Sequence, residues 1–243
     1  PTMAARLPSG SALAASLNMR RTTKTLGGVA VSKAAERTDV PARSVTAISH
    51  FSREASALEV QVADPLVRAV GETGLDYFHQ QDNKKAQQAL FGLNLELAVR
   101  YEKPVIVHSR AADEDTLAML GDYAGRRREY PGVLHCFTLD RACARRLLDV
   151  GFMISFSGIV TFANADALRE VVAYVPDDRL LVETDAPDLA PVPERGKENE
   201  PALVVHTGAK LAELRGCSVA AVAQLSMQNA WNLFGCGKRE SVE

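Results

Sequence analysis

Residues 104–110 read PVIVHSR, an apolar run that ends in a histidine and an arginine. The central Val-Ile-Val is β-branched and uninterrupted by polar residues, which is typical of a strand buried on both faces of a parallel sheet. A segment with helical spacing of apolar residues, Ala112–Tyr123, follows almost at once. We therefore predict a strand over Pro104–His108 that leads directly into a helix.

The same strand–helix unit repeats along most of the chain. Further apolar runs predict strands over Val67–Glu72, Gly132–Phe137, Phe152–Ser157 and Arg179–Thr184. Segments with helical periodicity predict helices over Asn83–Glu102, Asp140–Val150, Asn164–Tyr174, Pro201–Leu214 and Ser218–Phe234. This alternation predicts an α/β protein with a parallel sheet and right-handed crossovers. The repeats fit either a doubly wound sheet or most of a TIM-like (β/α)8 barrel.

Residues of metal-binding type follow four of these strands. They are Glu72, His108, His135 and Asp185. A doubly wound sheet gathers its site at one switch point, whereas a barrel builds its site from the ends of several strands. The pattern therefore favours the barrel, with an altered or incomplete first portion. The sequence has no dinucleotide fingerprint and no Gly-rich phosphate loop.

Carboxylates and imidazoles together form a ligand set for divalent cations. Glu72 has two oxygens that can bridge two ions. Taken singly, each carboxylate could be a helix cap and each histidine an ordinary core residue. Because four such residues end strands, we expect Glu72, His108, His135 and Asp185 to bind metal.

Length and composition are those of one large globular domain. The chain has 243 residues, 47% of them hydrophobic, and a net charge of −2, so a polyanionic ligand would have to be attracted locally. The four cysteines show no CxxC spacing, which favours reduced thiols and a cytoplasmic location. No apolar run is long enough to cross a membrane, and we expect no membrane partner.

Residues 1–60 differ from the rest, and we predict a boundary between this atypical segment and a domain over 61–243. Residues 1–35 contain no acidic residue but several arginines and lysines. The segment could be a transit peptide, a flexible arm or the product of an altered reading frame. We favour an atypical or non-native segment over targeting. Short strands are expected here over Gly28–Ser32, Val45–Ser49 and Leu58–Val62.

Several longer motifs occur in a characteristic order. They read GETGLD at 71–76, PVIVHSRAADE at 104–114, LHCF at 134–137, SFSG at 155–158, ETDAPDLAP at 183–191 and RGKENEP at 195–201. From about Val67 to Phe234 the chain resembles the TatD family of metal-dependent deoxyribonucleases, within the wider amidohydrolase-like metal barrels. Several long motifs in one order make a chance match very improbable.

The resemblance implies hydrolysis of nucleic-acid phosphodiester bonds, with exonuclease action on DNA as the leading expectation and RNA as the alternative substrate, using up to two divalent ions (Mg, Mn or Zn). It implies that His108, His135 and Glu72 hold one ion. Asp185 would bind the other, lie against the attacking water and accept its proton. The resemblance thus implies that Asp185 and Glu72 are catalytic. Arg110, Arg195 and Lys197 are candidates for substrate phosphates, although loop cations are often only solvated.

Two other residues are expected to support the ligands. Glu183 precedes Asp185 by two positions and is expected to orient a neighbour rather than bind metal. Asp76 follows Glu72 by four positions and is a candidate partner for a ligand.

One departure from the family pattern bears on activity. The family begins with a strand ending in His-x-His, which supplies two ligands, and this sequence contains no His-x-His. Its only histidine before His79 is His50. We therefore predict weak or absent nuclease activity. The alternatives are a small-molecule ester or amide hydrolase, or a non-catalytic degenerate barrel that acts as a binding protein.

Overall fold

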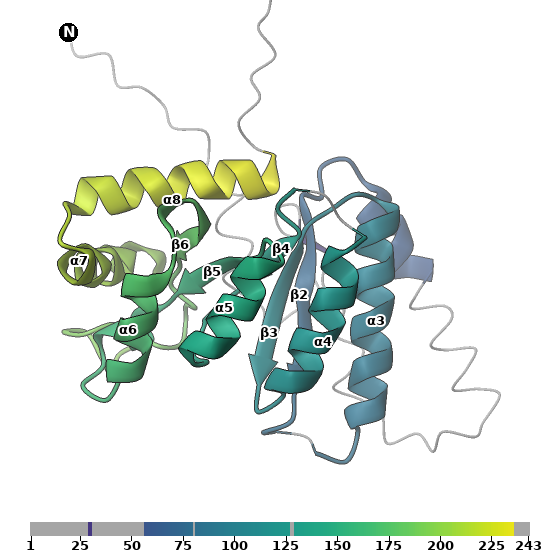
Figure 1. The fold of residues 1–243 in the computed structure, drawn as a ribbon, viewed down its shortest axis with the longest axis horizontal. Helices are drawn as coiled ribbons and strands as arrows, with labels where there is room; N and C mark the ends of the chain where they lie inside the picture. Colours follow the sequence, from purple (N-terminus) through teal and green to yellow (C-terminus); the bar gives the residue numbers. More distant parts are fainter. Residues whose placement is uncertain (1–28, 31–55, 80, 127–128, 236–243) are drawn as a thin grey trace, which may run out of the picture.

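The computed structural model describes residues 29–30, 56–79, 81–126 and 129–235. Within these residues, a parallel six-stranded sheet forms the centre of the molecule (Figure 1). Its strands are β1 (Val29–Ala30), β2 (Ala69–Asp76), β3 (Val105–Arg110), β4 (Gly132–Leu134), β5 (Met153–Phe156) and β6 (Leu180–Val182). Each strand pairs with the next one in the chain, so the order in the sheet is the order in the sequence. A doubly wound sheet reverses its order at a switch point, whereas a barrel does not.

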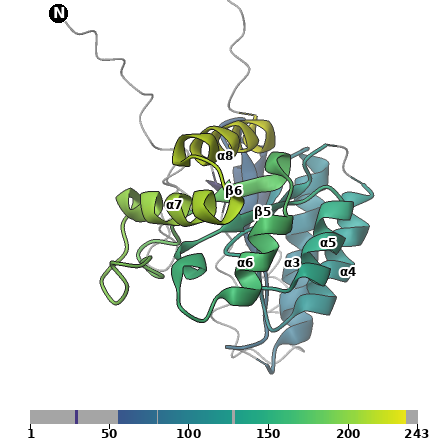
Figure 2. The ribbon, with the colours of Figure 1, turned by 60° about the vertical axis from the view of Figure 1, so that its left-hand side comes forward.

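Helices accompany the sheet: the first four named here return the chain from β2, β3, β4 and β5 to the next strand, and the last two follow β6. They are α3 (Lys84–Arg100), α4 (Asp113–Ala124), α5 (Arg141–Asp149), α6 (Asp166–Tyr174), α7 (Val204–Arg215) and α8 (Val219–Phe234), with short 3-10 turns η3 (Gly158–Thr161), η4 (Asp177–Arg179) and η5 (Pro201–Leu203). Figures 1 and 2 show α3, α4, α5 and α6 following one another along the same side of the sheet. The α/β class and the strands and helices predicted beyond residue 63 are confirmed, with shifts of a few residues at their ends.

Both faces of the sheet are buried. One face carries a small apolar layer made of one side chain from each of β2 to β6 and Leu233 of α8. The layer contains Ala69, Ile106, Val133, Met153, Leu181 and Leu233. The opposite face, with alternate residues such as Val105 and Val107, packs into the larger core beneath the helices. Burial on both faces explains why these strands read as continuous apolar runs.

The ends of β2 and β3 approach each other unusually closely at Gly74. Gly74 has a φ of 147°, and a Cβ at this position would lie 1.9 Å from the carbonyl oxygen of His108. No side chain fits in that space. Gly74 therefore allows β2 to pair with β3 at the level of His108, with which it is in register.

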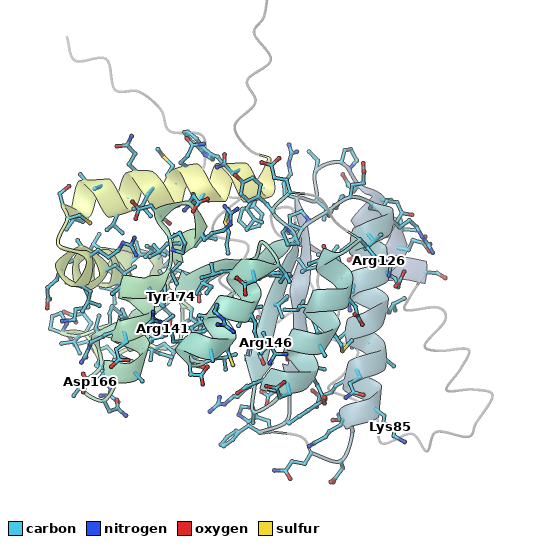
Figure 3. All side chains as sticks on the ribbon, viewed as in Figure 1. Lys85, Arg126, Arg141, Arg146, Asp166 and Tyr174 are labelled. Atoms are coloured by element: carbon cyan, nitrogen blue, oxygen red, sulfur yellow. The ribbon has the colours of Figure 1, made fainter. Side chains whose placement is uncertain are left out.

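Side-chain contacts hold the outer helices in place. The Arg141 guanidinium lies 4.4 Å from the ring centroid of Tyr174, which joins α5 to α6 (Figure 3). Arg146 of α5 donates to both carboxylate oxygens of Glu114 of α4 at 2.9 Å. Asp140 caps α5 by accepting a 2.8 Å hydrogen bond from the Cys143 backbone N–H.

The strand expected over Leu58–Val62 is wrong, because residues 56–63 form a helix. Leu58 and Val62 are buried with 7% and 0% of their surface exposed, whereas Val60 between them is 74% exposed. Residues four apart lie on one face of a helix, and alternating apolar residues satisfy this spacing as well as that of a strand. Lys103 secures the end of this helix by donating to the backbone carbonyls of Asp64, at 2.6 Å, and Val62.

The other expectations for the first 60 residues are only partly covered. Of the strand expected over Gly28–Ser32, Val29–Ala30 forms β1, and Val45–Ser49 and His50 lie outside the described residues. The boundary at residue 60 stays a prediction, although the helix over 56–63 crosses it. In the described part of the chain, no helix combines the length and the apolar character needed to span a bilayer.

Candidate metal centre

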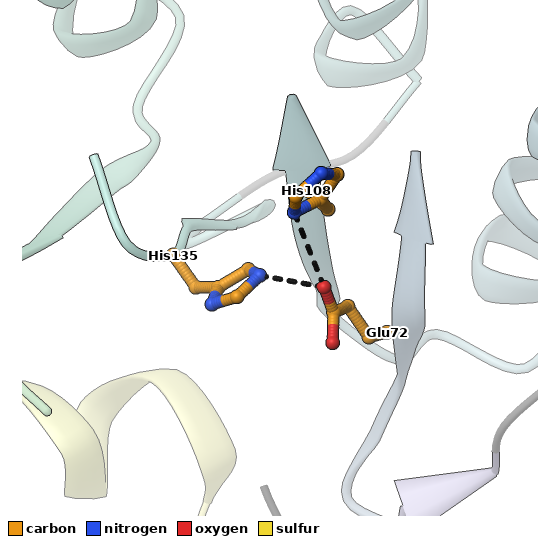
Figure 4. A group of neighbouring side chains, drawn as sticks. All are labelled: Glu72, His108 and His135. Atoms are coloured by element: carbon orange, nitrogen blue, oxygen red, sulfur yellow. Dashed lines mark hydrogen bonds and ion pairs between the residues drawn. The ribbon is translucent and has the colours of Figure 1, made fainter. Parts of the chain in front are cut away.

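Three of the predicted ligands meet where the strands end. Glu72 Oε1 lies 2.8 Å from His135 Nε2 and 3.3 Å from His108 Nδ1, so the carboxylate stands between two imidazoles (Figure 4). One potential ligand atom from each of the three residues lies within 4.8 Å of the others. An ion placed among them would meet one oxygen and two nitrogens, a combination suited to zinc, manganese and similar cations.

Three neighbouring strands bring these residues together. Glu72 lies within β2 and His108 within β3, and the two strands pair in parallel. His135 follows β4, and its backbone N–H donates to the carbonyl of Val107 at 3.0 Å, which extends the ladder by one residue. The parallel direction of the strands therefore puts all three side chains at the same edge of the sheet.

The electrostatics of the group favour positive charge. Burial raises the pKa of Glu72, but the imidazoles of His135 and His108 more than offset this and hold the pKa of the carboxyl well below its usual range. Burial lowers the pKa of His135, yet Glu72 and Glu183 outweigh it and leave this pKa well above its ordinary value. Carboxylates that stabilise a proton on His135 would also stabilise a bound cation.

Each imidazole has a second carboxylate beside its other ring nitrogen. Glu183 Oε1 lies 3.6 Å from His135 Nδ1, and Asp76 Oδ2 lies 3.5 Å from His108 Nε2. Glu183 is itself held by Ser155, whose hydroxyl donates at 3.0 Å. In metal sites, carboxylates orient imidazole ligands by accepting a hydrogen bond from the other ring nitrogen. Glu183 and Asp76 lie next to these nitrogens but beyond ordinary hydrogen-bond length, so their orienting roles stay predictions.

The group fits a divalent cation on the chemistry of its donors. In addition, His108 Nε2 is buried and makes no hydrogen bond among the described residues, because its contact with Asp76 lacks hydrogen-bonding geometry. Buried polar atoms without partners are uncommon and point to a missing ligand or to a functional site. Metal binding by Glu72, His108 and His135 nevertheless stays a prediction.

Asp185 lies outside this three-residue group. It follows β6 in a turn and has a φ of 58°, and its backbone oxygen accepts from the Asp188 N–H at 2.9 Å. Asp185 does affect the neighbour of His135: the pKa of the Cys136 thiol is raised well above its usual value by burial, then by Glu183 and Asp185. The roles of Asp185 as ligand and proton acceptor stay predictions.

Left-handed backbone conformations recur at this edge of the sheet. Ala111, Cys136 and Asp185 have φ values of 53°, 44° and 58°, and each follows the end of a strand. Non-glycine residues rarely adopt such angles, and they concentrate at functional sites where the surrounding structure holds them. The same conformation also occurs at Glu102 and Tyr130, which precede β3 and β4, so by itself it does not distinguish this edge of the sheet from the other.

The turn that carries Asp185 is held by a residue that the sequence did not single out. The Asn199 side-chain amide donates to the carbonyls of Thr184 at 2.7 Å and Asp188 at 2.6 Å. The backbone N–H of Asn199 also donates to Pro187 at 2.9 Å. Asn199 is only 4% exposed. The only indication in the sequence that Asn199 matters was that it lies within the motif RGKENEP, and the motif does not reveal these contacts.

The predicted substrate-binding cations are exposed and lie outside the three-residue group. The Arg110 guanidinium is 4.4 Å from the ring centroid of Phe78, and that of Arg195 is 4.2 Å from the ring centroid of Phe162. Lys197 pairs with Glu194 at 2.5 Å. Arg195 and Lys197 border an open hollow of about 350 Å³, whose lining also includes Phe162 and residues 187–190. Their contacts with phosphate stay predictions.

Fold and site together define a parallel α/β barrel architecture with a candidate metal centre at its carboxyl-terminal edge. The chain belongs to the family described as TatD related DNase, which it matches over residues 28–235. It is 52% identical over 172 residues to the uncharacterized metal-dependent hydrolase YcfH of Escherichia coli K12, covering 71% of this chain and 64% of YcfH. It is 37% identical to the uncharacterized metal-dependent hydrolase YabD of Bacillus subtilis, over 78% of this chain and 74% of YabD.

The solved structures agree with this assignment. The crystal structure of YJJV, a TatD homologue from E. coli K12, matches with a TM-score of 0.67 and 32% identity over 77% of this chain and 73% of YJJV. A TatD family hydrolase from Entamoeba histolytica has the same TM-score of 0.67 at 20% identity, over 78% of this chain and 71% of that chain, and shows the shared fold. The TIM-like fold class is confirmed. This chain spans 64% of the length of YcfH, so the activity of a whole protein of that length is a proposal here.

Proposed function

We propose that this chain is a metal-dependent hydrolase that cleaves phosphodiester bonds of DNA. The observation that carries the proposal is the meeting of Glu72, His108 and His135 at one edge of the sheet, in a member of the TatD related DNase family. The relatives at highest identity are named only as metal-dependent hydrolases. The assignment to DNA therefore rests on the family and on the chemistry of the centre.

Different residues of the chain would have different roles in the reaction. A divalent ion held by Glu72, His108 and His135 would polarise the phosphate, lower the pKa of water and offset negative charge in the transition state. Asp185, in its turn after β6, would accept the proton of the attacking water. Glu183 and Asp76 would keep the two imidazoles in orientation. Arg110 would contact a phosphate of the bound strand.

The missing His-x-His sets the expected level of activity. Without the two histidines of this motif, a second ion would have only Glu72 and Asp185 as ligands among the predicted ligand residues. Loss of a supporting residue alone typically lowers activity about 10- to 100-fold, and loss of two ligands should cost more. We therefore propose slow turnover, with one ion as the working state. The cytoplasmic location also stays a proposal, based on the cysteine spacing.

The test is cleavage of an end-labelled single-stranded oligonucleotide with enzyme in excess, which detects slow turnover. The expected result is cleavage that requires Mn²⁺, Mg²⁺ or Zn²⁺, stops with a chelator and is absent in Asp185→Ala. Glu170→Gln, a change at an exposed position on α6, serves as the matched control and should cleave like the wild type. A wild-type rate equal to that of Asp185→Ala with every metal would rule the proposal out. An RNA strand of the same sequence shows whether the sugar matters.

A further inference from the structure

We propose that Phe78 and Arg110 form a stacking site for one unpaired nucleobase beside the metal centre. The proposal rests on the proposed function, because it takes a nucleic-acid strand as the ligand. Phe78 follows β2, Arg110 ends β3, and the guanidinium lies 4.4 Å from the ring centroid of Phe78. The Tyr77 backbone N–H donates to the Arg110 carbonyl at 2.9 Å, which fixes the two segments against each other.

One carboxylate connects this pair to the metal centre. Asp76 Oδ1 accepts from the backbone N–H groups of Phe78 and His79, both at 3.0 Å. Its other oxygen lies 3.5 Å from His108 Nε2 and 2.6 Å from His79 Nδ1. The turn that presents Phe78 is therefore anchored on the same side chain that borders a predicted ligand. A base stacked on Phe78 would hold its own phosphate near the centre.

The Phe78 ring is available to a ligand. It is 60% exposed, although the Arg110 guanidinium lies over the ring and the His79 ring packs against it in a T-shaped arrangement with the centroids 5.1 Å apart. A single exposed apolar side chain is ordinary on a protein surface. Leu66 is such a case: it is 74% exposed, but it lies before β2, at the opposite edge of the sheet. Phe78 differs because its exposed ring stands at the edge that carries the predicted ligands.

The chemistry of the pair selects an unpaired base. Aromatic rings and guanidinium planes both stack on bases, and the stacking tolerates any sequence because every base has a π-face. Bases within a duplex already stack on their neighbours, so a free strand or a frayed end supplies the ligand. Lys84 lies 4.4 Å from the ring centroid of Tyr77 and adds a second positive charge beside the same turn. Binding should therefore also weaken as salt rises.

The test measures binding without cleavage. The 243-residue chain carrying Asp185→Ala, with Mn²⁺ present, is titrated with a short single-stranded oligonucleotide and with the same strand made abasic throughout. The quantity compared is the ratio of the two dissociation constants. One stacked base contributes about 1–3 kcal/mol, so this ratio should be roughly 5- to 150-fold in favour of the strand with bases.

Substitutions of Phe78 then show whether this residue causes the preference for the strand with bases. Phe78→Leu keeps an apolar side chain but removes the ring, and it should bring the ratio close to one. Phe78→Trp should restore it, and quenching of 2-aminopurine fluorescence should report the stacked base. Leu66→Ala is the matched control at the other edge and should keep the ratio of the parent protein.

The remaining outcomes would overturn either the stacking site alone or both proposals. An unchanged ratio in Phe78→Leu, or a ratio near one in the parent protein, overturns the stacking site and leaves the proposed nuclease function standing. Failure of the parent protein to bind either strand overturns the proposed DNA substrate, and the stacking site with it.

Discussion

Glu72 and His135 are 63 positions apart in the chain, yet Glu72 Oε1 lies 2.8 Å from His135 Nε2. The contact crosses from β2 to the end of β4, with β3 and His108 between them. The pair therefore exists only when three strands have assembled in register. Any ion that binds there should stabilise the folded protein, because the unfolded chain has no such site.

Metal should raise the melting temperature through Glu72. An ion at about one hundred times its Kd adds about 2.7 kcal/mol to the free energy of unfolding, which corresponds to roughly 5–10 °C for a domain of this size. Glu72→Gln should lose most of this rise, because an amide is a much weaker ligand for Mn²⁺ or Zn²⁺. Differential scanning fluorimetry with and without metal measures the shift. An equal rise in Glu72→Gln and in the control Glu170→Gln, an exposed position on α6, would show that the ion binds elsewhere.

Asn199 should matter for turnover more than for substrate binding. Asn199→Ala removes two hydrogen bonds from the turn that carries Asp185 and leaves buried carbonyls without partners. We expect a loss of about 2–4 kcal/mol in the free energy of unfolding and a fall in kcat with little change in KM. Urea denaturation and steady-state kinetics test this. Asn232→Ala, an exposed position on α8, is the control and should change neither. A kcat for Asn199→Ala equal to that of the wild type would refute the positioning role.

Two glycines should respond in opposite directions to the same change. At Gly74 a new Cβ would lie 1.9 Å from the His108 carbonyl oxygen, so Gly74→Ala should push β2 from β3 and cost about 3 kcal/mol or more. Gly121 lies inside α4 with nothing within 4 Å of a new Cβ, so Gly121→Ala should stabilise by about 0.5–1 kcal/mol. Chemical denaturation distinguishes them. A neutral Gly74→Ala would mean that the strands do not approach this closely.

The cap of α5 should make stability depend on pH. The backbone N–H of Cys143 donates to Asp140 and lowers the pKa of this carboxyl below its ordinary value. A lowered pKa in the folded state stabilises the protein above the unfolded-state pKa of about 3.9, and the contribution disappears as pH falls through the folded-state pKa. The stability difference between wild type and Asp140→Asn should therefore shrink between about pH 5 and pH 3.

A second cap provides the control for this experiment. Ser218 accepts from the Ala221 N–H at 3.1 Å at the start of α8 and carries no titrating group. Ser218→Ala should cost about 1 kcal/mol at every pH in the same range. Urea midpoints at pH 7, 5, 4 and 3 compare the two. A constant difference for Asp140→Asn across these values would contradict the shifted pKa.

Most of the fold could be predicted from the sequence, because apolar runs and helical periodicity are local properties. The strand of PVIVHSR and the helix after it lie within two residues of their predicted bounds. The failure at Leu58–Val62 has a local cause too. The order apolar-polar-apolar-polar-apolar satisfies a strand and one helical turn equally, and only contact with the core selects the helix.

The residues of the site could be predicted from the sequence, but their arrangement in space could be predicted only in part. Glu72, His108 and His135 could be grouped because each is linked to a strand end, and neighbouring strand ends converge. Asp185 belongs to a turn whose path depends on Asn199, so its place relative to the others could not be read from spacing. Phe78 was overlooked because an exposed aromatic residue leaves no periodic signal. Its contacts with Arg110 depend on two strands that are distant in sequence.

The small apolar layer that includes Leu233 also bears on the side from which a substrate could approach the site. Leu233 of α8 belongs to the same buried layer as Ala69, Met153 and Leu181 of β2, β5 and β6, whereas the predicted ligands stand towards the carboxyl ends of the strands. A substrate of the proposed reaction would therefore arrive, and its product would leave, at the edge that carries Glu72, His108 and His135.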